Sequence, residues 1–376
     1  MSETRLKIAY LSVFYPFRGG IAQFNTELFK ALSHKADVKA FNFSTQYPDL
    51  LFPGKTQFVA KTDEKPEIES DRLLSSVNPF TFRKTVKEIK VFKPDLLITA
   101  FWMPFFGPSL GYVTKQLKCS TKTISILHNV IPHEGRTGDE ALTKYYLNQQ
   151  AGFCVLSKTV KNDLLSLKNN AAFFQRPHPL YAQFGESKNK EKSKLNYGIN
   201  PNQKVLLFFG FIRKYKGLDL LIKAIKNLPS NTVILITGES YGDFKEYEDL
   251  LKLEGVTSKQ VIKHIRYIPD NEVANIFSAS DLCILPYRSA TQSGIASIAK
   301  YYQLPMVVTP VGELPNELID GETGIVCESC EPIDIAKGVE KGLANLTKFK
   351  NNLSSEKDEH TWGNFADKLI EFSNSI

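Results

Sequence analysis

The chain has 376 residues, of which 42% are hydrophobic and 23% carry a charge. The chain is longer than a domain with a single hydrophobic core usually is, and its length suits two domains. Its composition excludes a disordered chain. The formal net charge of +7 suits anionic ligands or an anionic membrane surface, but the lysines are spread along the chain, so nucleic acid is not a favoured partner.

The cysteines and the N-terminal residues bear on the compartment and on metals. Five cysteines form an odd set, which favours reduced thiols in a cytosolic protein. Cys327 and Cys330 form a CxxC pair, but no second Cys or His pair at metal-binding spacing accompanies it. No signal peptide is visible before the first apolar run. We therefore expect a cytoplasmic protein without a metal site.

Apolar runs and amphipathic helical patterns alternate along the first half of the chain, which is typical of a parallel sheet covered by helices. Strands are predicted at residues 7–14, 38–43, 56–59, 96–99, 121–127, 153–156 and 172–175. Helices are predicted at residues 21–32, 80–92, 108–117, 139–149 and 157–167. The charged, irregular residues 62–78 are expected to form a surface loop.

Gly19 and Gly20 lie between the first predicted strand and the first predicted helix. Glycine lets the backbone approach a ligand that a Cβ atom would keep away, and a helix start offers N–H groups to an anion. A tight turn needs glycine for steric reasons alone. Gly19 and Gly20 are therefore candidate ligand contacts, with a purely steric role as the alternative.

An aromatic segment, residues 101–106, follows the strand predicted at 96–99. Two interpretations of Trp102 within it stay open. It lines a ligand site or a membrane interface, or the segment is a buried corner between a strand and a helix.

Polar side chains follow the strand predicted at 121–127, in the order His128, Asn129, His133, Glu134 and Arg136. Open α/β sheets bind ligands at the carboxyl ends of their strands. We therefore select His128, His133, Glu134 and Arg136 as candidate site residues. In the alternative, His128 bonds the backbone and the other residues form a polar loop.

Residues 187–194, SKNKEKSK, contain no apolar side chain and are expected to be exposed chain at a domain boundary. Beyond them, strands are predicted at residues 205–209, 232–237, 261–268, 281–285, 306–309 and 324–327. Helices are predicted at residues 218–228, 244–253, 272–278, 333–346 and 364–372, and another opens at residue 293.

These elements predict two Rossmann-like, doubly wound α/β domains that face each other across a cleft. We expect a first domain over residues 1–180, a linker over 181–202 and a second domain over 203–355. The helix in residues 356–376 is a candidate to pack back on the first domain.

A basic loop follows the strand predicted at 205–209. Gly210 ends the strand, and Arg213, Lys214 and Lys216 follow within six residues. Fixed cations at the end of a parallel strand suit a phosphate or diphosphate. A solvated basic turn is the alternative interpretation.

Ser293 and Gly294 open a helix whose first residues are small. The N–H groups at such a bare helix start form an anion site complementary to Arg213 and Lys216. The loop before it offers Thr291 and Gln292 as further hydrogen-bonding candidates.

Two carboxylates follow the strand predicted at 306–309. Glu313 and Glu317 are expected to contact hydroxyl groups of a ligand, although Glu317 could equally cap a helix.

The order of these pieces resembles the retaining glycosyltransferases of family 4, which belong to glycosyl transferases group 1 and have the GT-B fold. The pieces are the double glycine, the basic loop ending in KG, the strand ending in LPYR, and the run LPMVVTPVGELPNELIDGETGIV. The resemblance spans nearly the whole chain and is strongest over residues 205–326.

The resemblance implies that the second domain binds a nucleotide-diphosphate sugar as the sugar donor, and that the first binds most of the acceptor. In that family, the residues matching Arg213 and Lys216 bind the diphosphate, and the one matching His128 contacts the donor sugar. Gly19 and Gly20 would lie beside the distal phosphate and the acceptor. The resemblance also places Gly210, Thr291, Gln292, Ser293, Gly294, Glu313 and Glu317 on the donor side, and His133, Glu134, Arg136 and Trp102 on the acceptor side.

The chain departs from the family pattern at a pair of glutamates. The family usually carries two glutamates eight positions apart, where this chain has Ala290 and Ile298. Thr291, Gln292 and Ser293 would supply neutral hydrogen bonds instead. The family's arginine also directly follows the strand glycine, where Phe211 stands here.

The favoured function is that of a retaining, metal-independent hexosyltransferase that uses no cofactor. It would move sugar from a nucleotide-diphosphate sugar to a glycan or polyprenyl-linked acceptor in cell-envelope polysaccharide synthesis. Its place would be the cytoplasm, in solution or peripherally on the inner face of the membrane. Two alternatives stay open: a non-catalytic protein that binds sugar nucleotides or glycans, and a sugar-nucleotide epimerase.

Overall fold

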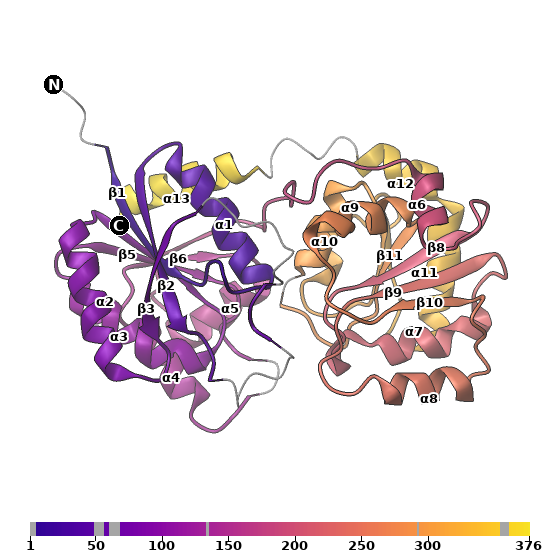
Figure 1. Ribbon diagram of the computed structural model, residues 1–376, viewed down its shortest axis with the longest axis horizontal. Helices are drawn as coiled ribbons and strands as arrows, with labels where there is room; N and C mark the ends of the chain where they lie inside the picture. Colours follow the sequence, from indigo (N-terminus) through magenta and orange to yellow (C-terminus); the bar gives the residue numbers. More distant parts are fainter. Residues whose placement is uncertain (1–4, 49–55, 60–67, 133–134, 292, 354–360) are drawn as a thin grey trace. The chain divides into compact units, whose positions relative to one another are not determined.

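The chain forms two compact units (Figure 1). The computed structural model describes residues 5–48, 56–59, 68–132, 135–291, 293–353 and 361–376. The first unit comprises Met1–Pro179 together with His360–Ile376, and the second comprises Leu180–Glu359. The first unit is therefore discontinuous in sequence, and the last helix of the chain belongs to it.

The described part of the first unit contains a sheet of seven parallel strands in the order β3-β2-β1-β4-β5-β6-β7. The strands are β1 (Lys7–Ser12), β2 (Asp37–Thr45), β3 (Ser70–Ser75), β4 (Leu96–Phe101), β5 (Lys122–Leu127), β6 (Gly152–Val155) and β7 (Phe173–Gln175). The helices are α1 (Gly20–Ser33), α2 (Pro79–Phe92), α3 (Gly107–Leu117), α4 (Asp139–Leu147), α5 (Lys158–Leu167) and α13 (Trp362–Ser375).

Both faces of this sheet are covered by helices, so the side chains of its central strands are buried on both sides. Successive side chains of a strand point to opposite faces. Ile8 and Tyr10 of β1 pack in one core with residues of α1 and α13, such as Phe24 and Phe365. Ala9 and Leu11, which alternate with them along β1, pack in a second core with residues of α2 to α5.

The described part of the second unit contains a sheet of six parallel strands in the order β10-β9-β8-β11-β12-β13. The strands are β8 (Lys204–Phe209), β9 (Thr232–Thr237), β10 (Val261–His264), β11 (Leu282–Leu285), β12 (Met306–Val308) and β13 (Gly324–Val326). The helices are α6 (Lys190–Asn196), α7 (Leu218–Ala224), α8 (Lys245–Leu253), α9 (Asp270–Ala279), α10 (Gly294–Tyr301), α11 (Pro332–Ala344) and α12 (Leu346–Leu353).

The third strand predicted from the sequence is wrong. Phe58 forms only an isolated bridge with Phe17, and the strand beside β2 is β3, which lies inside the expected surface loop. β3 is an edge strand, and only Leu74 and Ser75 in it are buried. Its sequence SDRLLS therefore lacks the apolar pattern of a central strand.

The expectation that residues 187–194 form exposed chain is correct only in part: residues 187–189, 191 and 192 are exposed, but α6 begins within this segment. Ser193 and Lys194 are buried. The Lys194 ammonium donates to the Gln203 carbonyl at 2.6 Å and lies 3.2 Å from the Asp281 carboxylate. Lys190 donates to the same carboxylate at 2.6 Å. A lysine enters a core when its charge is paired there, which composition alone does not reveal.

Candidate functional site

The strand order of the second unit reverses between β8 and β11. The chain proceeds from β8 outward to β9 and β10, then returns to the other side of β8 to form β11. Ligands of open α/β sheets bind outside the carboxyl ends of the strands at such a reversal. The loop that follows β8 carries Arg213 and Lys216, and the loop that follows β11 leads into α10. The topology thus places the two predicted anion-binding features at neighbouring strand ends.

Gly210 lies where these two features meet. Its φ angle of +96° is in the region that favours glycine. A Cβ atom on Gly210 would lie 3.2 Å from Cδ1 of Ile295, the second residue of α10, and 3.4 Å from Lys216 Nζ. The Lys216 ammonium and the first turn of α10 therefore converge at Gly210.

Lys216 is a buried cation, with 9% of its surface exposed. Its pKa is lowered from 10.5 to about 8, mainly because burial disfavours the charged form and further because of the nearby Arg213 charge. Among the described residues, no carboxylate lies within ion-pairing distance of its ammonium. A buried ammonium without a carboxylate partner favours an anionic ligand, because the negative charge of the ligand would compensate for the lost hydration of the ammonium.

Arg213 is held by an aromatic ring. Its guanidinium carbon lies 3.9 Å from the centroid of the Tyr241 ring, a cation–π distance. Tyr241 in turn makes an edge contact with Phe211, with ring centroids 5.0 Å apart. The sequence alone did not single out Tyr241 as a partner of Arg213, because 28 residues separate them in the chain.

The basic loop is anchored to the end of β11. Gly217 has a φ of +68°, and a Cβ atom there would lie 1.9 Å from the Pro286 carbonyl oxygen, so only glycine fits. Arg288 donates from both terminal nitrogens to the Asp219 carboxylate, at 2.8 and 2.6 Å. The Arg288 N–H also donates to the Tyr215 carbonyl at 2.6 Å. The arginine of the LPYR sequence thus fixes the loop that carries Lys216.

Ser293 is the N-cap residue of α10, as the sequence predicted for a helix opening at that position. Its hydroxyl accepts a hydrogen bond from the Ala296 N–H at 3.4 Å. Gly294 begins the helix, and its nearest neighbour beyond the adjacent chain is the Tyr181 ring. Thr291 is half-buried, whereas Gln292 lies outside the described residues.

Ala290 and Ile298, the two positions at which the resemblance led us to expect glutamates, are buried apolar side chains. Gly312 approaches this loop so closely that a Cβ atom would lie 1.7 Å from the Ala290 carbonyl oxygen. The Glu313 N–H donates to the same oxygen at 3.2 Å. Glu313, which is buried, therefore lies against the loop that contains Ala290.

Glu317 forms an ion pair with a lysine of α10. Its carboxylate accepts a hydrogen bond from the Lys300 ammonium of α10 at 2.7 Å. This ion pair fixes α10 to the segment after β12, so the structure gives Glu317 a partner within the protein.

In the first unit, His128 follows β5 and is buried. Its pKa is lowered to about 3, mainly by burial and further by the neighbouring His178. The rings of His128 and His178 both make edge contacts with Phe24, with centroids 4.8 and 4.9 Å away. His128 is therefore a neutral hydrogen-bonding group at physiological pH. No local pattern links His128 to His178, which lies 50 residues later in the chain.

The other candidates in the first unit are less closely grouped. Gly19 has a φ of +111° and Gly20 begins α1, and a Cβ atom on either would meet nothing within 4 Å. The exposed Arg136 has its N–H bonded to Asp139 at 2.9 Å. The Trp102 indole donates to the Tyr47 hydroxyl at 3.1 Å. His133 and Glu134 lie outside the described residues.

The described residues contain no group of three or more His, Cys, Asp or Glu side chains arranged to hold a metal ion. In the same part of the chain, no helix combines the length and the apolar character needed to cross a bilayer.

Comparison with known proteins identifies relatives of both the sequence and the fold. D-inositol 3-phosphate glycosyltransferase of Corynebacterium diphtheriae is 26% identical over 197 residues, which are 49% of this chain and only 45% of that enzyme. An uncharacterized glycosyltransferase of Methanocaldococcus jannaschii is 24% identical over 374 residues, which cover 94% of this chain and 93% of the relative.

Solved structures extend the likeness to both units. Sucrose-phosphate synthase from Thermosynechococcus elongatus has a TM-score of 0.76 at 17% identity and covers 99% of each chain. Anabaena HepE in complex with UDP has a TM-score of 0.76 at 13% identity, covering 99% of this chain and 100% of its own.

Two parallel-sheet α/β units with these structural neighbours define the GT-B fold. Within that class, residues 189–360 match the family model described as glycosyl transferases group 1. The part of the second unit that holds Lys216 and α10 thus resembles the glycosyl transferases group 1.

Proposed function

We propose that this protein is a retaining glycosyltransferase of family 4, divergent at the paired glutamates, that takes sugar from a nucleotide-diphosphate sugar. One observation carries the proposal: the buried Lys216 ammonium, which has no carboxylate partner among the described residues, and the first turn of α10 converge at Gly210. A buried cation and a helix start together suit a diphosphate. Structural neighbours that bind UDP, UDP-glucose and ADP support this class of donor.

The proposed reaction needs no covalent intermediate. The acceptor hydroxyl oxygen bonds to the anomeric carbon on the face from which the diphosphate leaves, as the bond between that carbon and the phosphate oxygen breaks. The leaving phosphate oxygen takes the acceptor proton. Arg213, Lys216 and the N–H groups of α10 stabilise the negative charge that develops on the diphosphate. His128 is neutral, so it would contact the donor sugar as a hydrogen-bond partner and not as an acid.

Glu313 is our candidate to replace the missing first glutamate, because its backbone bonds to Ala290 at the corresponding position. A carboxylate that accepts hydrogen bonds from sugar hydroxyls is worth more than a neutral amide of the same shape. We expect Glu313→Gln to lower kcat/KM roughly 10-fold or more, the value of one charged hydrogen bond. The measurement is steady-state transfer kinetics. Lys300→Gln, which removes the partner of Glu317, is the control and should lower kcat/KM much less; equal losses would contradict the role of Glu313.

The acceptor is proposed to be a glycan or a polyprenyl-linked glycan of the cell envelope, with the protein in the cytoplasm. The decisive experiment is calorimetry with a panel of uridine, guanosine and adenosine diphosphate sugars. Each donor that binds is then incubated with and without acceptors, and the anomeric configuration of the product is determined by NMR. Transfer with retained configuration supports the proposal, whereas inversion contradicts the mechanism. Isomerised donor formed without an acceptor would identify an epimerase.

A non-catalytic sugar-nucleotide-binding protein is the second candidate. The apolar Ala290 and Ile298 favour it, because no carboxylate at those positions contacts the donor. Micromolar binding of a donor with neither transfer nor hydrolysis, across a broad acceptor panel, would establish this function and refute the first.

A further inference from the structure

Helix α2 carries an exposed stripe that is both apolar and basic. Phe80 is 85% exposed and Val91 is 70% exposed, near opposite ends of the helix. Residues three, four and seven positions apart lie on one face of a helix. Arg83, Lys84 and Lys87 therefore share the exposed face with Phe80 and Val91, whereas Phe82, Thr85, Val86 and Ile89 form the buried face.

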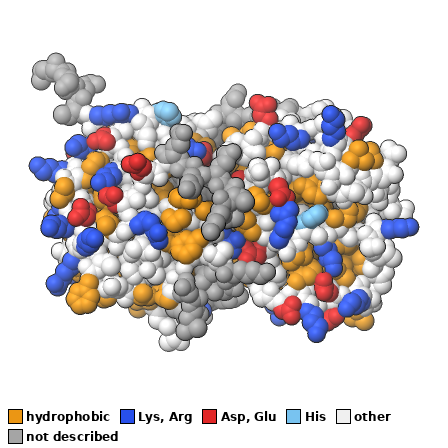
Figure 2. Space-filling view, viewed as in Figure 1, with side chains coloured by type: hydrophobic (Ala, Val, Ile, Leu, Met, Phe, Trp, Pro, Cys, Tyr) orange, Lys and Arg blue, Asp and Glu red, His pale blue; other side chains and the backbone are white. Residues whose placement is uncertain are grey.

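Among the described residues, no carboxylate lies within ion-pairing distance of Arg83, Lys84, Lys87 or Lys90, and Glu88 is the helix's sole acidic residue. Elsewhere on the molecule many exposed lysines do pair, for example Lys144 with Glu140. Lys and Arg side chains border apolar ones along the edge of the first unit where α2 and α3 lie (Figure 2).

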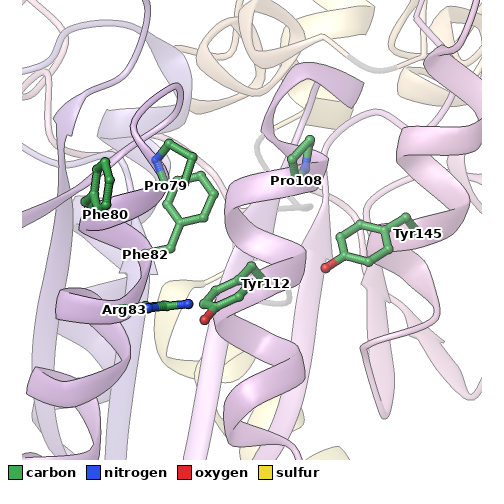
Figure 3. Close-up of a pocket in the computed structure, with 7 residues that line it drawn as sticks. All are labelled: Pro79, Phe80, Phe82, Arg83, Pro108, Tyr112 and Tyr145. Atoms are coloured by element: carbon green, nitrogen blue, oxygen red, sulfur yellow. The ribbon is translucent and has the colours of Figure 1, made fainter.

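An apolar groove opens beside the stripe. Its volume is about 370 Å³, and it is lined by Phe80 and Phe82 of α2 and by Tyr112 of α3 and Tyr145 of α4. Figure 3 shows the Arg83 side chain extending toward the Tyr112 ring, which leaves a cation at the groove. Phe80 and the groove together form one apolar patch bordered by cations, and such a patch is typical of an interaction surface.

We propose that this face of α2, with the adjoining groove, binds the surface of an anionic lipid bilayer. Phe80 enters the boundary between headgroups and acyl chains, and Arg83, Lys84, Lys87 and Lys90 contact lipid phosphates. The assignment differs from a membrane role for Trp102, whose indole is bonded to Tyr47 and packed on Phe106.

The arrangement of charge favours a bilayer over a protein or nucleic-acid partner. The stripe from Phe80 to Val91 is about 16 Å long at 1.5 Å per residue, and its cations are distributed along it. Mobile lipid phosphates can match such a distributed pattern. Lysine and arginine stems also lie along the interface while their charges reach the headgroups, and an aromatic side chain enters between them.

The test is flotation of the full-length protein with vesicles of phosphatidylcholine alone or mixed with phosphatidylglycerol. The test variant is Phe80→Ser, Arg83→Glu, Lys87→Glu. The matched control, Lys223→Glu, Lys245→Glu, Leu253→Ser, makes the same change in net charge on exposed residues of α7 and α8, including an 82% exposed leucine.

Wild type and control should float with the mixed vesicles and not with phosphatidylcholine alone. The partition coefficient of the test variant should fall about 30-fold or more, since each cation near an anionic bilayer contributes roughly a factor of five. Thermal unfolding checks the fold, and Arg83→Gln, Lys87→Gln serves as a second variant if the first unfolds. Wild type that fails to float, equal binding by test and control variants, or displacement of the protein from vesicles by equimolar RNA would overturn the proposal.

Discussion

Replacement of Lys216 by methionine should reduce activity and increase stability at the same time. Lys216 is buried, and its pKa of about 8 is well below its ordinary 10.5. A fixed charge that stabilises a developing anion is worth about 3 to 4 kcal/mol, so Lys216→Met should lower kcat roughly 100- to 1,000-fold. Transfer kinetics with a donor selected by calorimetry measure this loss.

The stability change follows from the same pKa. At pH 7, keeping Lys216 protonated in the folded protein costs about 3 kcal/mol, because its pKa falls from 10.5 to about 8. The unfolded chain binds the proton more tightly, so this cost diminishes as the pH rises from about 8 toward 10.5. Lys216→Met should therefore be about 3 kcal/mol more stable than wild type at pH 7, and the gap should narrow by about 1.4 kcal/mol at pH 9. Urea unfolding at both pH values measures it.

Deprotonation of Lys216, which removes the cost to stability, should also weaken donor binding. Above pH 8 the free protein loses the Lys216 ammonium, so the Kd of the donor should rise about tenfold between pH 7 and pH 9. Lys216→Met should bind weakly with a flat profile. Lys214→Met is the matched control, since Lys214 is exposed in the same loop and should leave kcat and stability nearly unchanged. Wild-type turnover in Lys216→Met, or a flat wild-type profile, would refute the reasoning.

Three further outcomes are expected. Tyr241→Ala should raise the donor Kd about 2- to 5-fold, because it removes the cation–π contact with the half-buried Arg213, whereas Tyr241→Phe should retain wild-type binding. Calorimetry that finds both variants alike would contradict the stacking role. Gly217→Ala should destabilise the second unit by roughly 2 kcal/mol or more in urea unfolding, because its Cβ atom would meet the Pro286 carbonyl, and an unchanged midpoint would be inconsistent with that close approach. Transfer activity should persist in EDTA, and a loss that Mg²⁺ restores would show that the diphosphate needs a metal.

The alternation of apolar runs and helices made the two-sheet architecture predictable, because a buried parallel strand must be apolar on both faces. The alternation of apolar runs did not predict elements that are only half-buried. β3 is an edge strand with polar residues, and α6 is a lysine-rich segment whose charges are paired on Asp281. Pairing over such a distance in the chain leaves no trace in local composition.

The candidate site likewise contains residues that local sequence predicts and contacts that it does not predict. Lys216, Ser293 and Gly210 follow from local sequence, since each ends or opens an element at the carboxyl edge of a strand. The contact of Arg213 with Tyr241, and that of Glu313 with Ala290, depend on how separate loops fold against one another. One sequence read by itself does not contain that information.

The discontinuity of the first unit has a consequence for biosynthesis. As the ribosome releases the chain from its N-terminus, Leu180–Glu359 emerges before α13 does. Until then, Phe24 and its neighbours on α1 lack the Phe365 side of their hydrophobic layer. The nascent protein can therefore fold its second unit while the first unit still exposes an apolar surface on α1, and the first unit is complete only when α13 packs there.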